Sequence, residues 1–465
     1  MSTILVLLLL TLVQFAIGFG IITLFRIQLK KGLMIPLAVL LGVAVFSFVP
    51  FLLQLCHISL TRVSIFSSLA VACILLNIRA WRGIKGMAYF KSMPYLARPR
   101  WKLRLYEIPF LLLMVLIIAA SAWRCFYYPP LPRDVTSGSE AIAEYAVREH
   151  TMINSLFSVN LESTNNPFKP PYIISLQLVY KLAGFPFGQI WLSVLFMAFI
   201  LFLYRALCHT LHPLLSGLLL LFFLAIPEMY AYTFLILFDY SNAVFFFLSL
   251  YILFAFFTDR RPGHLALAGL LMGIATYIRP ETLVLAAMVV PLMAWRLRQQ
   301  KAGIKTQVRT AVLFLWPAVL LYVISIPVYI NYYLPVKYHV PDLVNTHLLN
   351  LAPFFKRWWE MNAQLLFCRY GLERYGYFIY LFLLLLLAEI VVKRRFTAAG
   401  RNWLYAALVV YLGLPFLGWL LPLMDLDNTT KRGLFKLFPL LLLYLANNRL
   451  LTAFSEKINN WESKS

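Results

Sequence analysis

The chain has 465 residues, of which 62% are hydrophobic and 13% are charged, and its mean hydropathy is +0.80. This composition excludes an ordinary soluble domain and predicts a protein that crosses a membrane several times. The formal net charge of +23 does not indicate a nucleic-acid partner, because the basic residues gather in short clusters between apolar runs. The five cysteines form no CxxC or Cys/His spacing, so we predict neither a zinc site nor a disulfide framework.

Apolar runs long enough to cross a bilayer recur along the chain. A transmembrane helix needs about 20 mostly apolar residues, and this length predicts an all-α polytopic membrane protein with about thirteen transmembrane helices. We place them at 4–25, 33–56, 61–79, 107–125, 187–206, 213–227, 239–257, 264–279, 281–296, 310–330, 376–392, 403–423 and 434–449.

Basic clusters predict the orientation of these spans. The segment 79–104 is rich in Lys and Arg and contains no acidic residue, so we expect it in the cytoplasm. Counting spans from there places loops 127–187 and 331–375 outside and the C-terminus inside. The predicted organisation is three N-terminal spans with a basic loop (1–106), a core (107–330) that carries the outer loop 127–187, a further outer loop (331–375), and C-terminal spans with a tail (376–465).

The outer loop 127–187 is the longest polar interruption of the chain, and a cluster of ionisable groups beside a bilayer suggests a functional site. A Ser-x-x-Glu capping box at 137–140 predicts a helix start. Apolar residues at helical spacing continue the expected helix to Phe157, with Glu144, Arg148 and Asn154 turned towards water. A similar helix over 172–182 follows the Lys-Pro-Pro break at 169–171. Both helices are expected to lie on the membrane surface.

Two carboxylates are candidates for acid–base chemistry. Asp134 follows a proline-rich turn, where a carboxylate can orient or deprotonate an acceptor hydroxyl, although a loop or helix-capping role also fits. Asp239 is the second candidate. Asp239 opens an apolar run, and an aspartate in the first turn of a helix often interacts only with the helix dipole.

Four basic residues in or next to outer loops are candidates for binding a phosphate. Arg279 either pairs with Glu281 or presents its forked donors to a phosphate. Lys169 either contacts a lipid phosphate or snorkels to the headgroups. Arg148 and Arg432 complete the set. The Asp-x-Asp sequence at 425–427 is too short a match to predict a metal, and we predict no metal site and no cofactor.

The order of these motifs resembles the membrane glycosyltransferases of GT-C fold, in particular the polyprenyl-phosphate-sugar users grouped with protein O-mannosyltransferases and aminoarabinose lipid A transferases. The resemblance covers about 107–300. It rests on Asp134 at the start of the first outer loop, the E-x-x-x-x-Y-A pattern at 140–146, Lys-Pro-Pro at 169–171, and the glycine-paired segment 268–281 that ends in Arg-Pro-Glu. The chain departs from the family in having Val135 where a second acidic residue is usual, so the resemblance implies that Glu140 or Asp239 takes the place of that second carboxylate. It departs also in its three additional N-terminal spans.

This resemblance implies an inverting transfer of a sugar from a polyprenyl-phosphate carrier to a hydroxyl of a glycan, lipid or protein. Asp134 would be the catalytic carboxylate that orients or deprotonates the acceptor, and Lys169 and Arg279 would contact the lipid phosphate. Because the subgroup is mostly bacterial, the expected location is the plasma (inner) membrane, with catalysis on the extracytoplasmic side. Two alternatives stay open: a glycan polymerase or ligase that uses a lipid diphosphate donor, and a lipid or glycan transporter without catalysis.

Overall fold

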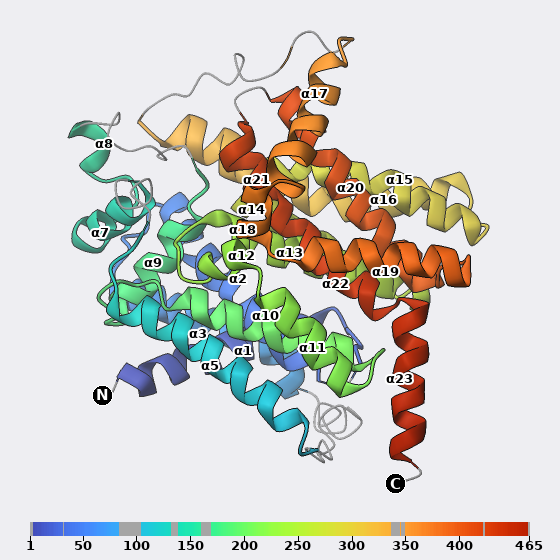
Figure 1. Cartoon of the computed structure of the whole chain (residues 1–465). Coiled ribbons are helices and arrows are strands. Elements are labelled where there is room, and N and C mark those ends of the chain that lie inside the picture. The colour runs from blue at the N-terminus through green and yellow to red at the C-terminus, as the bar shows by residue number, and fades with distance from the viewer. Residues whose placement is uncertain are drawn as a thin grey trace. The chain divides into compact units, whose positions relative to one another are not determined.

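The computed structural model describes residues 3–30, 32–82, 104–131, 138–159, 169–335, 345, 349–421 and 424–463. Within these residues the secondary structure is helical and contains no strand, which confirms the expected all-α class (Figure 1). Asp134 and Ser137 lie outside the described residues, so the first catalytic candidate and the capping serine have no structural description.

The chain divides into two compact units, each described here by itself. Unit 1 comprises residues 1–205, 233–238 and 324–337, and unit 2 comprises residues 206–232, 239–323 and 338–465. Unit 1 therefore joins the N-terminal spans to the outer loop 127–187. The predicted core 107–330 is shared between the two units.

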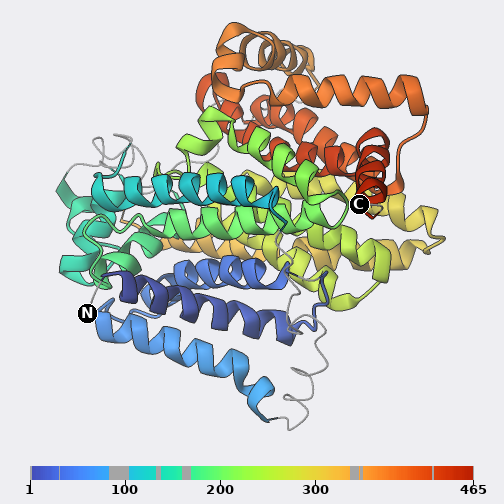
Figure 2. The ribbon, with the colours of Figure 1, turned by 60° about the horizontal axis from the view of Figure 1, so that its bottom comes forward.

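The helices of unit 1 are α1 (Thr3–Leu24), α2 (Met34–Leu55), α3 (Arg62–Arg82), α5 (Glu107–Tyr127), α7 (Ser139–Glu149), α8 (Leu156–Val159), α9 (Tyr172–Leu182), most of α10 (Trp191–Cys208) and the π-helix η1 (Ile324–Tyr333). Helix α1 packs against both α2 and α3, and Figure 2 shows these three N-terminal helices side by side. The contact between α1 and α2 is close, because a Cβ atom added to Gly18 would lie 1.8 Å from the carbonyl oxygen of Ala38. Small residues permit such an approach of helix backbones in membrane proteins.

The helices of unit 2 are α11 (Pro213–Leu224), α12 (Pro227–Ala231), α13 (Phe238–Asp259, except its first residue), α14 (Pro262–Ile278), α15 (Thr282–Gln299), α16 (Ile304–Val323), α17 (Ala352–Glu360), η3 (Met361–Leu366), α18 (Arg369–Tyr375), α19 (Phe378–Lys393), α20 (Ala398–Leu420), η4 (Leu426–Thr430), α21 (Lys431–Gly433), η5 (Leu434–Lys436), α22 (Leu437–Ala446) and α23 (Arg449–Glu462). Helices α14 and α16 pack closely along Gly269 and Gly273. A Cβ atom at either glycine would lie within 3 Å of a carbonyl oxygen of α16.

A helix occupies each of the thirteen ranges predicted to cross the membrane. Among the described residues, seven helices are long and apolar enough to span a bilayer, or nine if two bent pairs each form one span. Several of the other predicted spans, such as α11 and α14, are shorter apolar helices. The chain is therefore a polytopic membrane protein by length and composition, with seven or more candidate spans.

Two of the predicted non-helical regions contain helices. The outer loop 331–375 holds α17, η3 and α18, and the C-terminal tail forms α23. Polar residues are frequent in α17 and α23, so neither segment contains a continuous apolar run. A search for apolar runs alone overlooks amphipathic helices of this kind.

Candidate functional site

The helix α7 presents three charged side chains along one face, because residues four apart in an α-helix lie one turn above another. Glu140, Glu144 and Arg148 occupy this face, and Glu144 pairs with Arg148 at 3.1 Å on the exposed side. The helix ends at Glu149, where His150 adopts a left-handed conformation with φ of 58°. The expected continuation to Phe157 is therefore wrong, and α8 is a separate short helix.

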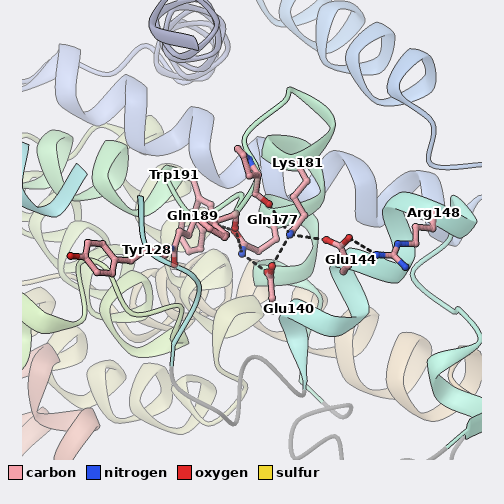
Figure 3. A network of polar contacts seen from close by, with 10 residues as sticks. Tyr128, Glu140, Glu144, Arg148, Gln177, Lys181, Gln189 and Trp191 are labelled. Carbon is pink, nitrogen blue, oxygen red and sulfur yellow. Dashed lines mark hydrogen bonds and ion pairs between the residues drawn. The ribbon is translucent and has the colours of Figure 1, made fainter. Parts of the chain in front are cut away.

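Lys181, in the last turn of α9, is the centre of a polar network between α7 and α9 (Figure 3). Its Nζ lies 2.7 Å from Oε1 of Glu140 and 2.9 Å from Oε2 of Glu144. The other oxygen of Glu140 accepts a hydrogen bond from the side-chain amide of Gln177, whose own oxygen accepts from the indole of Trp191 at 3.0 Å. Both oxygens of Glu140 are thus engaged by neighbouring side chains.

Burial and charge shift the pKa values of these groups. Burial raises the pKa of Glu140, against the opposing effect of the Lys181 charge. The hydrogen bond from Lys181 lowers the pKa of Glu144. Burial by itself lowers the pKa of Lys181, but the charges and hydrogen bonds of the two glutamates outweigh it and raise that pKa. Among these groups, Glu140 is the carboxyl whose pKa is raised, which is the direction expected of a carboxyl that exchanges a proton.

Helix α9 is packed inside unit 1, because nearly all its residues are buried. It packs against α2 on one side and α7 on the other. Asn154, expected to face water, is also buried, and its side-chain amide donates to the carbonyl oxygen of Ile142 at 2.9 Å. The loop 127–187 is therefore a packed part of the fold in its described segments.

The three N-terminal spans hold this loop in place. The side-chain oxygen of Gln54, in α2, accepts a hydrogen bond from the backbone N–H of Met152 at 2.7 Å. The guanidinium of Arg62, at the start of α3, donates to the carbonyl oxygen of Leu182 at 2.7 Å. These contacts give the additional helices a structural role, which the amino-acid sequence did not indicate.

Lys169 and Arg148 occupy different environments in unit 1. The ammonium of Lys169 lies 5.2 Å from the ring centroid of Phe238, within the range of a cation–π contact. The side chain of Arg148 is 68% exposed, and its pairing with Glu144 is the surface type that contributes little stability.

In unit 2, Arg279 lies at the corner between α14 and α15. Pro280 disfavours helix at the preceding residue, so α14 ends and Arg279 takes an extended conformation. Its guanidinium pairs with Asp239, in the first turn of α13, and with Glu281. The pairing with Glu281 is one of the two alternatives stated for Arg279, whereas the pairing with Asp239 was not predicted. The side chains of Asp239 and Arg279 are largely buried, with exposures of 2% and 13%.

Further basic residues surround a second carboxylate, Glu228. The ammonium of Lys431 lies 3.1 Å and the guanidinium of Arg374 3.5 Å from the same oxygen of Glu228. The guanidinium of Arg432 lies over the ring of Tyr232, 5.9 Å from its centroid, and its Nε is buried without a hydrogen-bond partner in the described structure. Burial raises the pKa of Tyr232, while the charge of Arg432 opposes this shift.

Lys436, in η5, lies close enough to Arg279 and Glu281 for their charges to interact. Its side chain is 3% exposed. No hydrogen bond or ion pair links Lys436 to another residue in the part of the chain that the structure describes. A buried ammonium without a partner is costly, and a bound anion would offset this cost.

We call these residues of unit 2 the basic cluster. It consists of five cations and three carboxylates: Arg279, Arg374, Lys431, Arg432 and Lys436, with Glu228, Asp239 and Glu281. Positive charge exceeds negative charge by two, which suits an anionic group such as a phosphate. The cluster contains two phosphate candidates of the sequence, Arg279 and Arg432, and the carboxylate candidate Asp239.

In the Asp-x-Asp segment at 425–427, the first aspartate caps a helix and binds backbone N–H groups. Asp425 caps η4, and its carboxylate accepts hydrogen bonds from the backbone N–H groups of Asn428 and Thr429 at 3.1 and 2.8 Å. Within the described ranges, no group of three or more His, Cys, Asp or Glu side chains is arranged to hold a metal ion.

Comparison of the chain with protein-family models, with curated proteins and with solved structures found no match. The resemblance to GT-C glycosyltransferases therefore stays an interpretation of the motifs in this sequence.

Sequence reasoning missed Lys181, Arg374 and Lys436. Lys181 carried a usable signal, because it is the one charged residue in an otherwise apolar helical stretch of the outer loop. Lys436 carried a similar signal, since it interrupts the start of the last apolar run. Ionisable groups within apolar segments near a membrane deserve the same scrutiny as those in loops.

Proposed function

We propose that the chain is an inverting membrane glycosyltransferase that moves a sugar from a polyprenyl-phosphate carrier to an acceptor hydroxyl at the outer face of the membrane. The observation that supports this most directly is the basic cluster of unit 2, in which cations outnumber carboxylates and the Lys436 side chain, 3% exposed, forms no hydrogen bond or ion pair within the described residues. An anion in this place would complete the coordination of groups that the protein itself leaves unsatisfied. The lipid phosphate of the donor is an anion of the right kind.

In the proposed reaction, the acceptor oxygen bonds to the anomeric carbon of the sugar as the bond from that carbon to the phosphate oxygen breaks. The electron pair leaves with the polyprenyl phosphate, so negative charge develops on the phosphate. Fixed cations such as Arg279 and Lys436 would stabilise that charge in the transition state. The proton of the acceptor hydroxyl would pass to a carboxylate, for which Asp134 is our first candidate.

Two described carboxylates are available as a second acid–base group. Glu140 has a raised pKa, which favours proton transfer, but both its oxygens engage Lys181 and Gln177. Asp239 pairs with Arg279 and is better suited to hold that guanidinium in place. We therefore assign Asp239 a positioning role and retain Glu140 as the alternative proton acceptor.

The proposed chemistry needs no metal, because protein cations can balance the phosphate charge. We expect transfer to continue when divalent cations are removed with EDTA. Loss of transfer on EDTA treatment, restored by added magnesium or manganese, would contradict this expectation and assign the charge balance to a metal ion.

The test is sugar release from radiolabelled polyprenyl-phosphate sugars by membranes that contain equal amounts of the wild-type chain or a variant. We expect one donor to turn over, Asp134→Asn to abolish turnover while donor binding is retained, and Lys436→Met to weaken donor binding. Arg369→Gln is the matched control, because Arg369 is an exposed cation of the predicted outer loop 331–375, outside the basic cluster.

The same cluster also suits a diphosphate, since it offers several cations. Lipid diphosphate sugars therefore form a second arm of the assay. Turnover of a diphosphate donor alone would support the polymerase or ligase alternative. If neither donor class turns over, the transferase proposal fails, and transport of a labelled lipid across proteoliposomes becomes the next measurement.

A further inference from the structure

Apart from the basic cluster, unit 2 contains a pair of arginines at the opposite end of α15 from Arg279. Arg296 occupies the last turn of α15, and Arg401 occupies the first turn of α20, which packs against α15. The fourteen residue-to-residue steps from Thr282 to Arg296 correspond to about 20 Å of helix. This pair is therefore separate from the basic cluster described above.

The two arginines are incompletely satisfied. The terminal nitrogens of Arg296 donate to two neutral acceptors, the side chain of Gln299 at 2.9 Å and the carbonyl oxygen of Ala398 at 3.2 Å. The Nε atoms of Arg296 and Arg401 are both buried without a hydrogen-bond partner among the described residues. The side chain of Arg401 forms no hydrogen bond or ion pair within the same residues.

Like charge makes this arrangement unfavourable by itself. The guanidinium of Arg401 repels that of Arg296, and within the described structure neither of them pairs with a carboxylate. Two partly buried cations held together without a counter-charge carry an electrostatic cost. An anion with forked acceptor oxygens, such as a phosphate, would remove this cost through bidentate hydrogen bonds.

An apolar groove leads away from the arginines between the same two helices. Its volume is about 400 Å³, within the range of small-molecule sites. Helix α15 lines it with Met288, Pro291, Leu292 and Trp295, at the spacing of a single helix face. Helix α20 lines it with Tyr405, Leu408, Val409 and Leu412, at the same spacing. Of these residues, Leu408 and Leu412 are exposed.

Aromatic rings mark the end of the groove nearest the arginines. The rings of Trp295 and Tyr405 meet edge to face with centroids 4.8 Å apart, and the guanidinium of Arg296 lies 5.4 Å from the Trp295 ring centroid. Trp and Tyr are enriched at the depth of lipid headgroups, and Arg is enriched on the cytoplasmic side. Each lining face covers eight residues, or about 10 Å along the helix axis.

We propose that this groove binds an anionic phospholipid, with its phosphate on Arg296 and Arg401 and one acyl chain along the apolar faces of α15 and α20. The charge of the paired arginines selects a phospholipid with net negative charge over a zwitterionic one. The apolar groove that continues from the arginines selects a lipid over a soluble phosphate. The site is independent of the proposed sugar transfer and requires no donor.

The experiment measures thermal unfolding of the purified full chain in a neutral detergent with added phosphatidylglycerol or phosphatidylcholine of the same acyl chains. We expect phosphatidylglycerol to raise the unfolding temperature of the wild type by several degrees more than phosphatidylcholine does. The double variant Arg296→Gln/Arg401→Gln should lower the apparent affinity for phosphatidylglycerol at least tenfold. Arg298→Gln is the matched control, because Arg298 is an exposed arginine in the same helical turn, and it should behave as the wild type.

A second arm separates the headgroup from the acyl chain. Glycerol phosphate, which has no acyl chain, should leave the unfolding temperature unchanged, and Leu408→Trp, which fills the groove, should weaken phosphatidylglycerol binding with both arginines intact. The proposal is overturned if the wild type does not distinguish the two phospholipids, if the double variant keeps the preference, or if glycerol phosphate alone reproduces the shift. The wild-type comparison decides this even if a variant fails to fold.

Discussion

Replacing Lys181 by methionine should loosen the attachment of α7 to α9. The side chains of Lys181 and Glu140 are 7% and 12% exposed, so the substitution strands a nearly buried carboxylate. Removing one partner of a buried ion pair costs about 3–5 kcal/mol. Because a little exposure remains and Gln177 still donates to Glu140, we expect Lys181→Met to cost about 2–4 kcal/mol.

A second substitution tests whether the unpaired charge of Glu140 causes the loss of stability in Lys181→Met. Glu140→Gln in the Lys181→Met background removes the charge and keeps a side-chain oxygen for the amide of Gln177. It should recover about 1–2 kcal/mol, which appears as a coupling energy in a double-mutant cycle. Arg148→Gln removes an exposed partner of Glu144 and should change stability by less than about 0.5 kcal/mol.

Hydrogen exchange of the α7 amides in detergent micelles reports this local opening. A loss of about 2–4 kcal/mol accelerates exchange by about 30-fold to several hundred-fold, since about 1.4 kcal/mol corresponds to a factor of ten. If the Lys181→Met protein keeps wild-type protection of α7, the network does not anchor this helix. If the double variant is no better protected than the single one, the reasoning from a stranded Glu140 is refuted.

Three further predictions concern other parts of the chain. Lys436→Met should raise the unfolding temperature in the absence of donor while it weakens donor binding, because it removes a buried charge; a variant less stable than the wild type would contradict this. Gly273→Leu should destabilise the protein by about 1–3 kcal/mol in thermal unfolding, because a side chain there meets the backbone of α16, whereas Gly303→Leu, with open space around its Cβ position, should be neutral. The raised pKa of Lys181 means that its stabilisation is fully present below the ordinary value of 10.5 and is lost as pH rises through the higher folded value. Limited proteolysis of α7 should therefore accelerate as the pH rises above about 10.5 in the wild type and much less in Lys181→Met.

The helices themselves were readable from the sequence to a large extent. Apolar runs predicted a helix at each of thirteen places, and the helical spacing of the outer loop predicted α7 and α9. The burial of α9 within unit 1 was not predicted. An apolar helix of eleven residues can lie on the surface of a protein or pack against another helix, as α9 packs against α2. The helices α17 and α18 were missed because their charged and aromatic residues interrupt any apolar run.

The candidate site was readable only in part. Arg279, Arg432 and Asp239 were singled out as charges next to outer loops, and the structure includes all three in the basic cluster. The pairing of each cation could not be predicted from the sequence, because it depends on distances between segments that are far apart along the chain. Lys436 therefore gained its significance only once its neighbours were known.

The amino-acid sequence by itself determined that this is a helical protein of the membrane, because apolar composition, run length and helical periodicity are local properties that allow few alternatives in a bilayer. Only the tertiary structure decided that the N-terminal helices support the outer loop, that Lys181 lies between two glutamates, and that an arginine pair meets an apolar groove. These features arise where separate helices pack together. Packing sets the distances on which ion pairs and lipid contacts depend, and those distances are not encoded in any single segment.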